Sequence, residues 1–395
     1  MDFQNVNPLN VWLNVFTGNL LPMVDHDPSI SFFWRMYSVF VWILEIAVTI
    51  MMIPGFMYVS MEKAVNDSLI CFVETIEMFF MIWRINARKD LMYLLIQKLN
   101  EMLHTADETM KNIVTETLNP IKVPLNFYWT TGTMSIIAWH LVTFLVIFEK
   151  NLFYYEDYRV PAGFFKQPFS LKVFLLGGLF ILLGMVYAFI KKVSAEVYTV
   201  HLILMITAQY RYIAEKIAMI FQEENEGDEC QKRHFSTSYR EKETEIRALC
   251  RHHNEMIYLM SMLKELLSLT FSVMYINNVL RFCFIGVMLG NLAKVTFFEA
   301  ISVIIYTSGA LAQLYILCSC VQQLINASTE ISDKAFHEKW YLLQPSIKHL
   351  FILIIMANKL ECKMATFKNF NFSLPSFMAI LNQSYSIALL FLKTN

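Results

Sequence analysis

The sequence predicts an all-α membrane protein with seven transmembrane helices. Hydrophobic residues make up 56% of the 395 residues and charged residues only 16%, against about 25% charged residues in ordinary soluble proteins. The mean hydropathy is +0.45. A soluble protein of this composition could not cover its surface with polar groups, and disorder requires low hydrophobicity with high net charge. The net charge of −1 leaves no basic excess for binding nucleic acid.

Seven stretches have the roughly 20 mostly apolar residues that a helix needs to cross a bilayer. They are residues 36–59, 68–83, 123–148, 173–190, 266–290, 300–325 and 372–392. A further apolar run, 350–357, is too short to cross and predicts a packed soluble helix. Residues 197–221 and 239–262 continue the helical pattern beyond the membrane, on either side of a polar hairpin connection.

Four ionisable residues lie inside these stretches, where charges are costly and usually mark a function. Glu45 and Arg281 could pair with each other across the bundle, or each could reach an interface separately. Glu74 and Glu77 are three residues apart and therefore share one helix face. The sequence names no partner for either of these two carboxylates.

The basic residues predict the orientation of the chain in the membrane. Three loops, 84–125, 191–254 and 326–372, hold 22 Lys and Arg residues, whereas the opposite loops and the C-terminal tail hold seven. Basic loops stay in the cytoplasm. This places the N-terminus in the cytoplasm and the C-terminus outside, the reverse of a G-protein-coupled receptor. Lys191 and Lys192 are interpreted as the cytoplasmic boundary of the fourth span.

The outer loop 149–170 is rich in aromatic residues and contains no cysteine. Two interpretations remain open for it: an aromatic belt at the membrane interface, or a lid over the route of an apolar ligand. Asn66 begins a glycosylation sequon in the outer loop after the first span. The seven cysteines are too dispersed for a disulfide framework. The sequence contains no pattern of metal ligands or catalytic residues, so we expect no cofactor and no enzyme activity.

Four features near the C-terminus form a recognisable combination. They are an aromatic pair at Trp340 and Tyr341, a small-residue/Phe turn at 365–367, a Ser-Leu-x-x-Phe helix start at 373–377 and a Ser-Tyr-Ser core at 384–386. This combination resembles the insect odorant receptor family. The family usually continues with Tyr-Phe after that core, where this chain has Ile387 and Ala388. Upstream, the resemblance is one of architecture: chain length, seven spans, orientation and long cytoplasmic helical extensions.

The resemblance implies the ligand-binding, odorant-specific subunit of a heterotetrameric, odorant-gated non-selective cation channel. Its partners would be a small volatile odorant, a shared co-receptor subunit and membrane lipid, with no G protein, in the plasma membrane of a sensory neuron dendrite. The implied division is 1–33 as a cytoplasmic N-terminal segment, 34–325 as helices one to six with the ligand pocket and cytoplasmic extensions, 326–371 as a cytoplasmic anchor that includes Trp340 and Tyr341, and 372–395 as the pore-lining last helix.

The last span carries a helix face that would suit a pore. Residues at steps of three or four share a face, and together with the resemblance this predicts a pore and gate at Gln383, Ser386, Leu390 and Thr394. A ring of Leu390 side chains would gate the pore by excluding water. Small polar residues also line packed membrane helices, so an ordinary helix interface remains the alternative.

The resemblance also implies a ligand pocket in the outer half of spans two to six. Mostly apolar walls with a few polar groups suit a small volatile molecule, although each aromatic ring could equally serve helix packing. Residues about two turns below the outer surface are the candidates for the pocket: Phe72, Ile76, His140, Phe144, Phe180, Leu183, Asn277 and Tyr306.

Three other classes of protein are compatible with seven spans. A gustatory-type relative would share the fold and the channel mechanism but detect tastants, and the Ser-Tyr-Ser ending favours the odorant branch. A metabotropic seven-span receptor is disfavoured by the predicted orientation and by the outer loop without cysteine. A transporter would need Gly- or Pro-interrupted helices at the midplane, and only Pro54 and Gly55, near the end of the first span, hint at that.

Overall fold

The computed structural model describes residues 2–23, 31–60, 63, 69–163, 166–222, 235–292, 295–338, 340–342, 345–357 and 372–394. Within these ranges the regular secondary structure is helical, apart from an isolated bridge between Phe153 and Phe169. The predicted all-α class is therefore confirmed. The sequon predicted at Asn66 and the turn at 365–367 lie outside the described residues.

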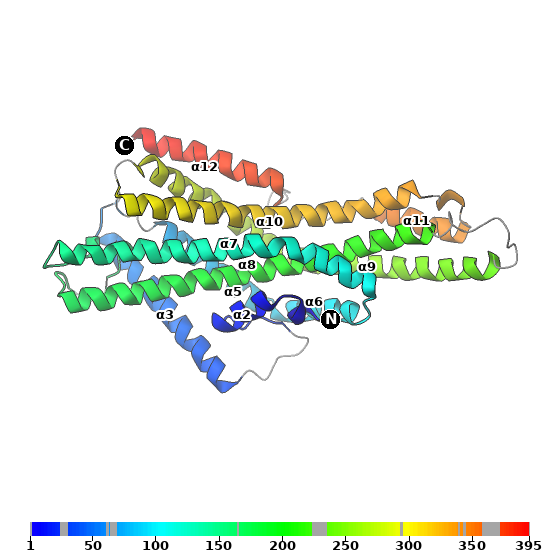
Figure 1. The fold of residues 1–395 in the computed structure, drawn as a ribbon, viewed down its shortest axis with the longest axis horizontal. Helices are drawn as coiled ribbons and strands as arrows, with labels where there is room; N and C mark the ends of the chain where they lie inside the picture. The colour runs from blue at the N-terminus through cyan, green and yellow to red at the C-terminus, as the bar shows by residue number, and fades with distance from the viewer. Residues whose placement is uncertain are drawn as a thin grey trace.

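Four long helices form the main body of the molecule (Figure 1). They are α7 (Glu108–Leu145), α8 (Leu171–Gln222), α9 (Phe235–Gly290) and α10 (Phe297–His337). α8 and α9 contain 52 and 56 residues. At 1.5 Å per residue each is about 80 Å long, whereas the hydrocarbon core of a bilayer is about 30 Å thick. The helical continuations predicted for residues 197–221 and 239–262 are thus confirmed.

Three shorter helices complete the predicted set of seven. These are α3 (Phe32–Met57), α5 (Leu69–Ala87) and α12 (Leu374–Thr394), with α3 and α12 on opposite sides of the bundle near one end (Figure 1). Among the described residues, six helices are long and apolar enough to cross a bilayer: α3, α7, α8, α9, α10 and α12. α5 takes the place of the second predicted span, but it contains Glu74, Glu77 and Arg84 in only 19 residues. Its position inside the bundle therefore depends on charge pairing.

The N-terminal residues fold into two helices that the sequence pattern did not predict. α1 (Phe3–Val6) and α2 (Pro8–Phe16) lie against the bundle together with α6 (Lys89–His104) (Figure 1). The chain then turns at Gly18, whose φ of 66° is in the left-handed region that glycine adopts without strain. The Asn19 amide donates to the Lys191 carbonyl oxygen over 3.1 Å. The N-terminal segment is thereby fixed to the middle of α8.

The end of the bundle farthest from α12 carries a short apolar helix. α11 (Pro345–Ala357) packs against α10 and α9, which confirms the packed helix predicted around 350–357. A single 3-10 turn, η4 (Trp340–Leu342), precedes it. The ring of Trp340 packs on the main core, and Tyr341 is 57% exposed. The two residues expected in an anchor therefore lie beside α11, at the end of the bundle farthest from α12 (Figure 1).

The connection between α7 and α8 forms a small aromatic core of its own. It contains two 3-10 turns, η1 (Val146–Phe148) and η2 (Tyr155–Asp157). The rings of Phe153 and Tyr158 stack on Phe174 of α8, with centroid distances of 4.3 and 4.8 Å. Phe153 and Tyr158 are at most 2% exposed. These two rings therefore pack inside the protein and not in an interfacial belt, where rings face lipid head groups, whereas Tyr154 of the same loop is 43% exposed.

Candidate functional site

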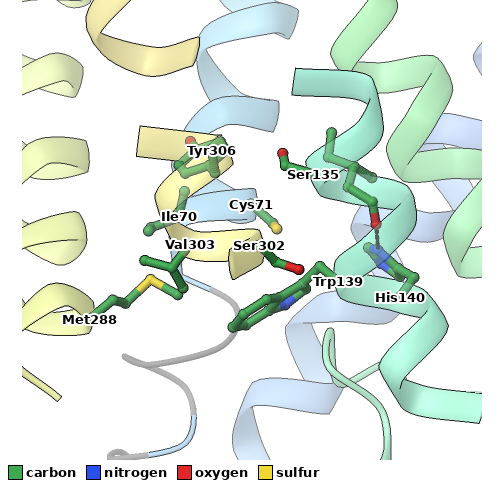
Figure 2. A pocket seen from close by; sticks show the side chains of 10 residues that line it. Ile70, Cys71, Ser135, Trp139, His140, Met288, Ser302, Val303 and Tyr306 are labelled. Carbon is green, nitrogen blue, oxygen red and sulfur yellow. Dashed lines mark hydrogen bonds between the residues drawn. The ribbon is translucent and has the colours of Figure 1, made fainter. Parts of the chain in front are cut away.

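An apolar cavity lies between α5, α7, α9 and α10 (Figure 2). The hollow contains about 450 Å³ of space outside protein atoms, part of which is open to the surroundings. The lining residues are Ile70, Cys71, Ser135, Ile136, Trp139, His140, Met288, Ser302, Val303 and Tyr306.

The spacing of these residues explains how each helix contributes to the cavity. Residues 135, 136, 139 and 140 recur at helical spacing and form one face of α7, and residues 302, 303 and 306 do the same on α10. A second hollow shares Ile70, Cys71, Ile136 and Tyr306 with the first and reaches α8 at Met185 and Lys192. The two hollows therefore form adjoining lobes, the second of which ends on charged side chains.

The charged side chains at the end of the second lobe, which form the floor of the cavity, belong to a buried network centred on Glu74. One oxygen of this carboxylate, Oε1, is 2.7 Å from Arg281 Nη1 and accepts a hydrogen bond from the Tyr306 hydroxyl over 2.9 Å. The other oxygen accepts from Lys192 Nζ. Lys192 also lies 3.3 Å from Glu77 Oε2. The cavity residue Tyr306 is thus bonded directly to an ion pair that joins α5, α8 and α9.

The network continues through a third carboxylate on α8. Glu196 lies 3.7 Å from Lys192, accepts from the Tyr128 hydroxyl over 2.7 Å and accepts from the amide of Gln313. Arg281 also donates to Gln313 and, over 2.6 Å, to Asn278. Three carboxyl groups, on Glu74, Glu77 and Glu196, thus face two cations in a dry interior, where unpaired charge is very costly.

A second buried pair lies outside this network. Lys191 Nζ is 2.9 Å from Glu45 Oε2, and both side chains are completely buried. The ammonium group also lies 3.6 Å from the centre of the Trp42 ring, a cation–π geometry. Of the two alternatives left open for Glu45 and Arg281, a pairing of the two with each other is therefore wrong. Lys191 and Lys192 also do more than mark a membrane boundary, because both ammonium groups neutralise carboxylates of neighbouring helices inside the bundle.

The cavity is covered on one side by the aromatic connection between α7 and α8. The guanidinium of Arg159 lies over the Trp139 ring, 5.2 Å from its centre, and forms an ion pair with Glu299. Glu299 stands in the first turn of α10, where its carboxylate accepts from the Thr296 backbone N–H over 2.9 Å. The connection is therefore attached to the start of α10, across a wall of the cavity.

The last helix has one face packed on α9 and one face directed away from it. On the packed face, the Ser384 hydroxyl lies 3.0 Å from the Val279 carbonyl oxygen. Further along the same side, Gly286 faces Ala388 and Gly290 faces Leu392, so glycine allows a close approach of α9 and α12.

Two of the residues predicted to line a pore, Ser386 and Leu390, lie away from this contact, whereas Gln383 is bonded to α9. Ser386 is exposed and Leu390 is 66% exposed. Gln383 is also exposed, and its Oε1 accepts a hydrogen bond from the Tyr275 hydroxyl over 3.2 Å. The side chain of Thr394 lies outside the described set. The pore assignment of this face stays a prediction.

Comparison with known proteins identifies the family. A sequence model of the family described as "7tm Odorant receptor" matches residues 63–385, which is most of the chain. The chain belongs to the 7tm odorant receptor family. It is accordingly a multi-pass membrane protein of a receptor family.

Individual relatives of this odorant receptor family member are distant. Odorant receptor 67a of Drosophila melanogaster is 26% identical over 141 residues, covering 35% of this chain and 34% of the relative. Putative odorant receptor 85d of the same species is 19% identical over 140 residues, again 35% of this chain and 34% of the relative. The chain therefore aligns with about a third of the length of the curated relatives it matches.

The fold is shared with solved structures over the whole chain. The insect olfactory receptor OR5 from Machilis hrabei, in complex with eugenol, superposes with a TM-score of 0.79 at 12% identity, covering 100% of both chains. The structure of OR5 alone gives 0.76 at 14% identity, over 98% of this chain and 97% of that one. At this identity the likeness is one of fold.

Of the eight residues predicted for the pocket of this odorant receptor family member, His140 and Tyr306 line the cavity. The other six are absent from the lining of both lobes. Phe72 packs edge-on against Phe56 with ring centres 5.5 Å apart, and Phe180 joins the aromatic core near Phe174. Phe144 packs beside Gly178, and Asn277 is half-buried. Ile76 and Leu183 are 45% and 53% exposed, so their side chains point away from the bundle.

Proposed function

We propose that this chain is an odorant receptor, the ligand-binding subunit of an odorant-gated, non-selective cation channel that it forms with a shared co-receptor subunit. The location would be the plasma membrane of a sensory neuron dendrite, with a cytoplasmic N-terminus and an extracellular C-terminus. The observation that carries the proposal is the apolar cavity whose floor, through Tyr306, is hydrogen-bonded to a charged network. Mostly apolar walls with a few polar groups suit a small volatile molecule.

A continuous set of contacts leads from the cavity to the last helix. Tyr306 donates to Glu74, which pairs with Arg281 of α9. Arg281 lies two residues beyond Val279, whose carbonyl oxygen contacts Ser384 of α12. A ligand that alters the position of Tyr306 acts on this chain of contacts, because a buried ion pair is costly to break and its partners tend to move together. Movement of α9 would then shift α12, which we propose lines the pore.

The proposed assembly accounts for the exposed face of α12. Ser386 and Leu390 face away from their own bundle and would meet the equivalent helices of neighbouring subunits. An apolar ring at Leu390 closes a pore by excluding water from a narrow neck. The long extensions of α8, α9 and α10, with α11, supply the surface for a cytoplasmic anchor. The family membership supports this arrangement.

The proposal is tested by recording currents from cells that express this chain with and without the co-receptor. A panel of small volatile molecules, including eugenol, is applied to outside-out patches in a solution free of GTP. We expect a non-selective cation current only in cells that express both subunits. A current that disappears when GTP is withheld, from channels otherwise intact, would instead indicate a metabotropic receptor.

A further inference from the structure

We propose that the cavity selects small apolar molecules that carry a hydroxyl group, that is, alcohols or phenols. In this arrangement the ligand hydroxyl donates to His140 Nε2 and accepts from the indole N–H of Trp139. The inference rests on the proposed function and adds the chemical class of the ligand. It comes from the hydrogen-bonding groups that the cavity residues leave unused.

His140 is the first of these residues, and its tautomer follows from its contacts. Its Nδ1 lies 2.8 Å from the Ile136 carbonyl oxygen (Figure 2). A carbonyl oxygen only accepts, so Nδ1 carries the proton, and Nε2 of the neutral ring presents a lone pair. The side chain is 4% exposed and lines the cavity, and no described residue donates to Nε2. An unpaired buried acceptor is costly, and a ligand that donates to it removes that cost.

The hydroxyl groups around the cavity cannot fill that role, because their protons are used elsewhere. Each donates to an acceptor of the protein over 2.9 Å: Ser135 to the Gly132 carbonyl oxygen, Ser302 to the Phe298 carbonyl oxygen and Tyr306 to Glu74. These groups leave only oxygen lone pairs toward the cavity. Its hydroxyl-bearing walls are therefore acceptors.

Trp139 supplies a hydrogen-bond donor among the residues that line the same cavity as His140. It follows directly before His140 on α7, and both line the same cavity, at the end opposite Tyr306 (Figure 2). Within the described ranges no residue accepts a hydrogen bond from the Trp139 indole N–H, which can only donate. A hydroxyl group is both donor and acceptor, so it can satisfy Trp139 and His140 together.

Other ligand groups satisfy these residues less well. An ether, ketone or ester oxygen accepts from Trp139 but leaves His140 Nε2 unpaired. A carboxylate would enter an apolar cavity in which Arg159, the cation over the Trp139 ring, is already paired with Glu299. Burying such an uncompensated charge is far more costly than burying a hydroxyl group. The gain or loss of one neutral hydrogen bond changes the half-maximal ligand concentration by about threefold to tenfold.

Isomeric ligands test the inference without any change to the protein. Phenylethyl alcohol is compared with benzyl methyl ether, and hexyl alcohol with methyl pentyl ether, on cells that express this chain with the co-receptor. The members of each pair have the same atoms and nearly the same volume. We expect the half-maximal concentration to be about threefold to tenfold lower for the alcohol. Equal potency within the pairs, or greater potency of the ethers, would overturn the inference while leaving the proposed function intact.

Three variants assign the preference to named atoms. His140→Phe keeps a ring and removes the acceptor, so the alcohol should lose its advantage while the ether keeps its potency. His140→Gln, which offers an amide oxygen near the position of Nε2, should restore part of the preference. Trp139→Phe is the matched control, because it removes a donor that both isomers use and should weaken both alike. A His140→Phe effect of equal size on alcohol and ether would refute the proposed hydrogen bond.

The outcomes also separate this inference from the proposed function. If no volatile molecule evokes a current although both subunits reach the surface, the proposed function fails, and the inference fails with it. If ethers evoke currents as well as alcohols do, only the ligand class is wrong. Where a variant does not reach the surface, the isomer comparison on the wild-type chain decides the question.

Discussion

Replacing Arg281 with methionine should destabilise the protein by about 3–5 kcal/mol, the usual cost of removing one partner from a buried ion pair. Arg281 is 2% exposed, and its Nη1 lies 2.7 Å from Glu74 Oε1. Two unit charges about 4 Å apart at an effective dielectric constant of about 20 attract each other by about 4 kcal/mol, which agrees with that range. After the substitution, three carboxyl groups would face Lys192 alone.

The thermal unfolding of the detergent-purified protein measures this effect, and a second substitution tests its electrostatic origin. Arg281→Met combined with Glu74→Gln leaves one more carboxyl group than cations in the network, as in the wild type. The double variant should therefore recover much of the lost stability. Arg88→Met is the matched control, since Arg88 forms an exposed ion pair with Glu265 at 2.8 Å, and such pairs contribute about 0–1 kcal/mol. A double variant less stable than Arg281→Met, or an Arg281→Met variant as stable as Arg88→Met, would refute the reasoning.

Three further predictions concern the membrane orientation, the gate and the α7 cap. An epitope tag at the N-terminus should be stained only after permeabilisation and one at the C-terminus without it; surface staining of the N-terminal tag would reverse the orientation. Leu390→Ser should raise the resting current or change the cation permeability ratios, because a polar side chain lets water into an apolar neck. Leu389→Ser is the control and should mainly affect expression. Unchanged permeability ratios and resting current in Leu390→Ser, at matched surface expression, would place the gate elsewhere. Asp107→Ala should cost about 1 kcal/mol in thermal unfolding assays, because Asp107 caps α7 by accepting from the Met110 N–H over 2.9 Å and pairs with Lys216 at 2.7 Å. Partial burial tends to raise the pKa of Asp107, but the hydrogen bonds from Lys216 and Met110 hold it below its ordinary value. The stability difference between Asp107→Ala and wild type should therefore persist at neutral pH and shrink below pH ~4, where the wild-type carboxylate is protonated. A stability difference that grows on acidification would contradict this.

The helices could be predicted from the sequence because their signal is local and strong. Long apolar runs and their polar continuations specify α8 and α9, whatever surrounds them. α6 and the N-terminal helices gave no such signal, because short amphipathic helices form chiefly through packing on a bundle that is already present. Lys191 and Lys192 show the same limit. A basic pair at the end of an apolar run is typical of a membrane boundary, and only partners on α3 and α5 make it a buried site.

A count of charges could have located those partners. The predicted spans contain Glu45, Glu74 and Glu77 but only one cation, Arg281, so two cations were missing from the interior. The adjacent pair that follows the fourth span is a natural source of them. Buried charges require compensation, and that requirement applies across helices even where the order of residues along the chain gives no sign of it.

The residues predicted for the pocket differ from the lining of the cavity in helix rotation and depth, which one sequence does not specify. On α5 the prediction selected Phe72 and Ile76, whereas Cys71 and Thr75 line the lobes, a shift of one residue or about 100° around the helix. On α8 it selected Leu183, although the lining begins at Met185 and continues toward Lys192. Helix rotation and vertical offset depend on ion pairs and close helix contacts that become visible only in three dimensions.

α8 is a single helix that lines the second lobe of the cavity and continues to the far end of the bundle. Its Lys191 and Lys192 are held from two sides by Glu45 and Glu74, and about 30 residues, or about 45 Å of helix, follow them. A rigid rod that pivots at such a point moves farther at its tip than at its pivot. A tilt of about two degrees, too small to disturb the local packing, would displace the end of α8 by about 1.5 Å. The end of α8, which would belong to the proposed cytoplasmic anchor, is therefore where the smallest rearrangements near the cavity become largest.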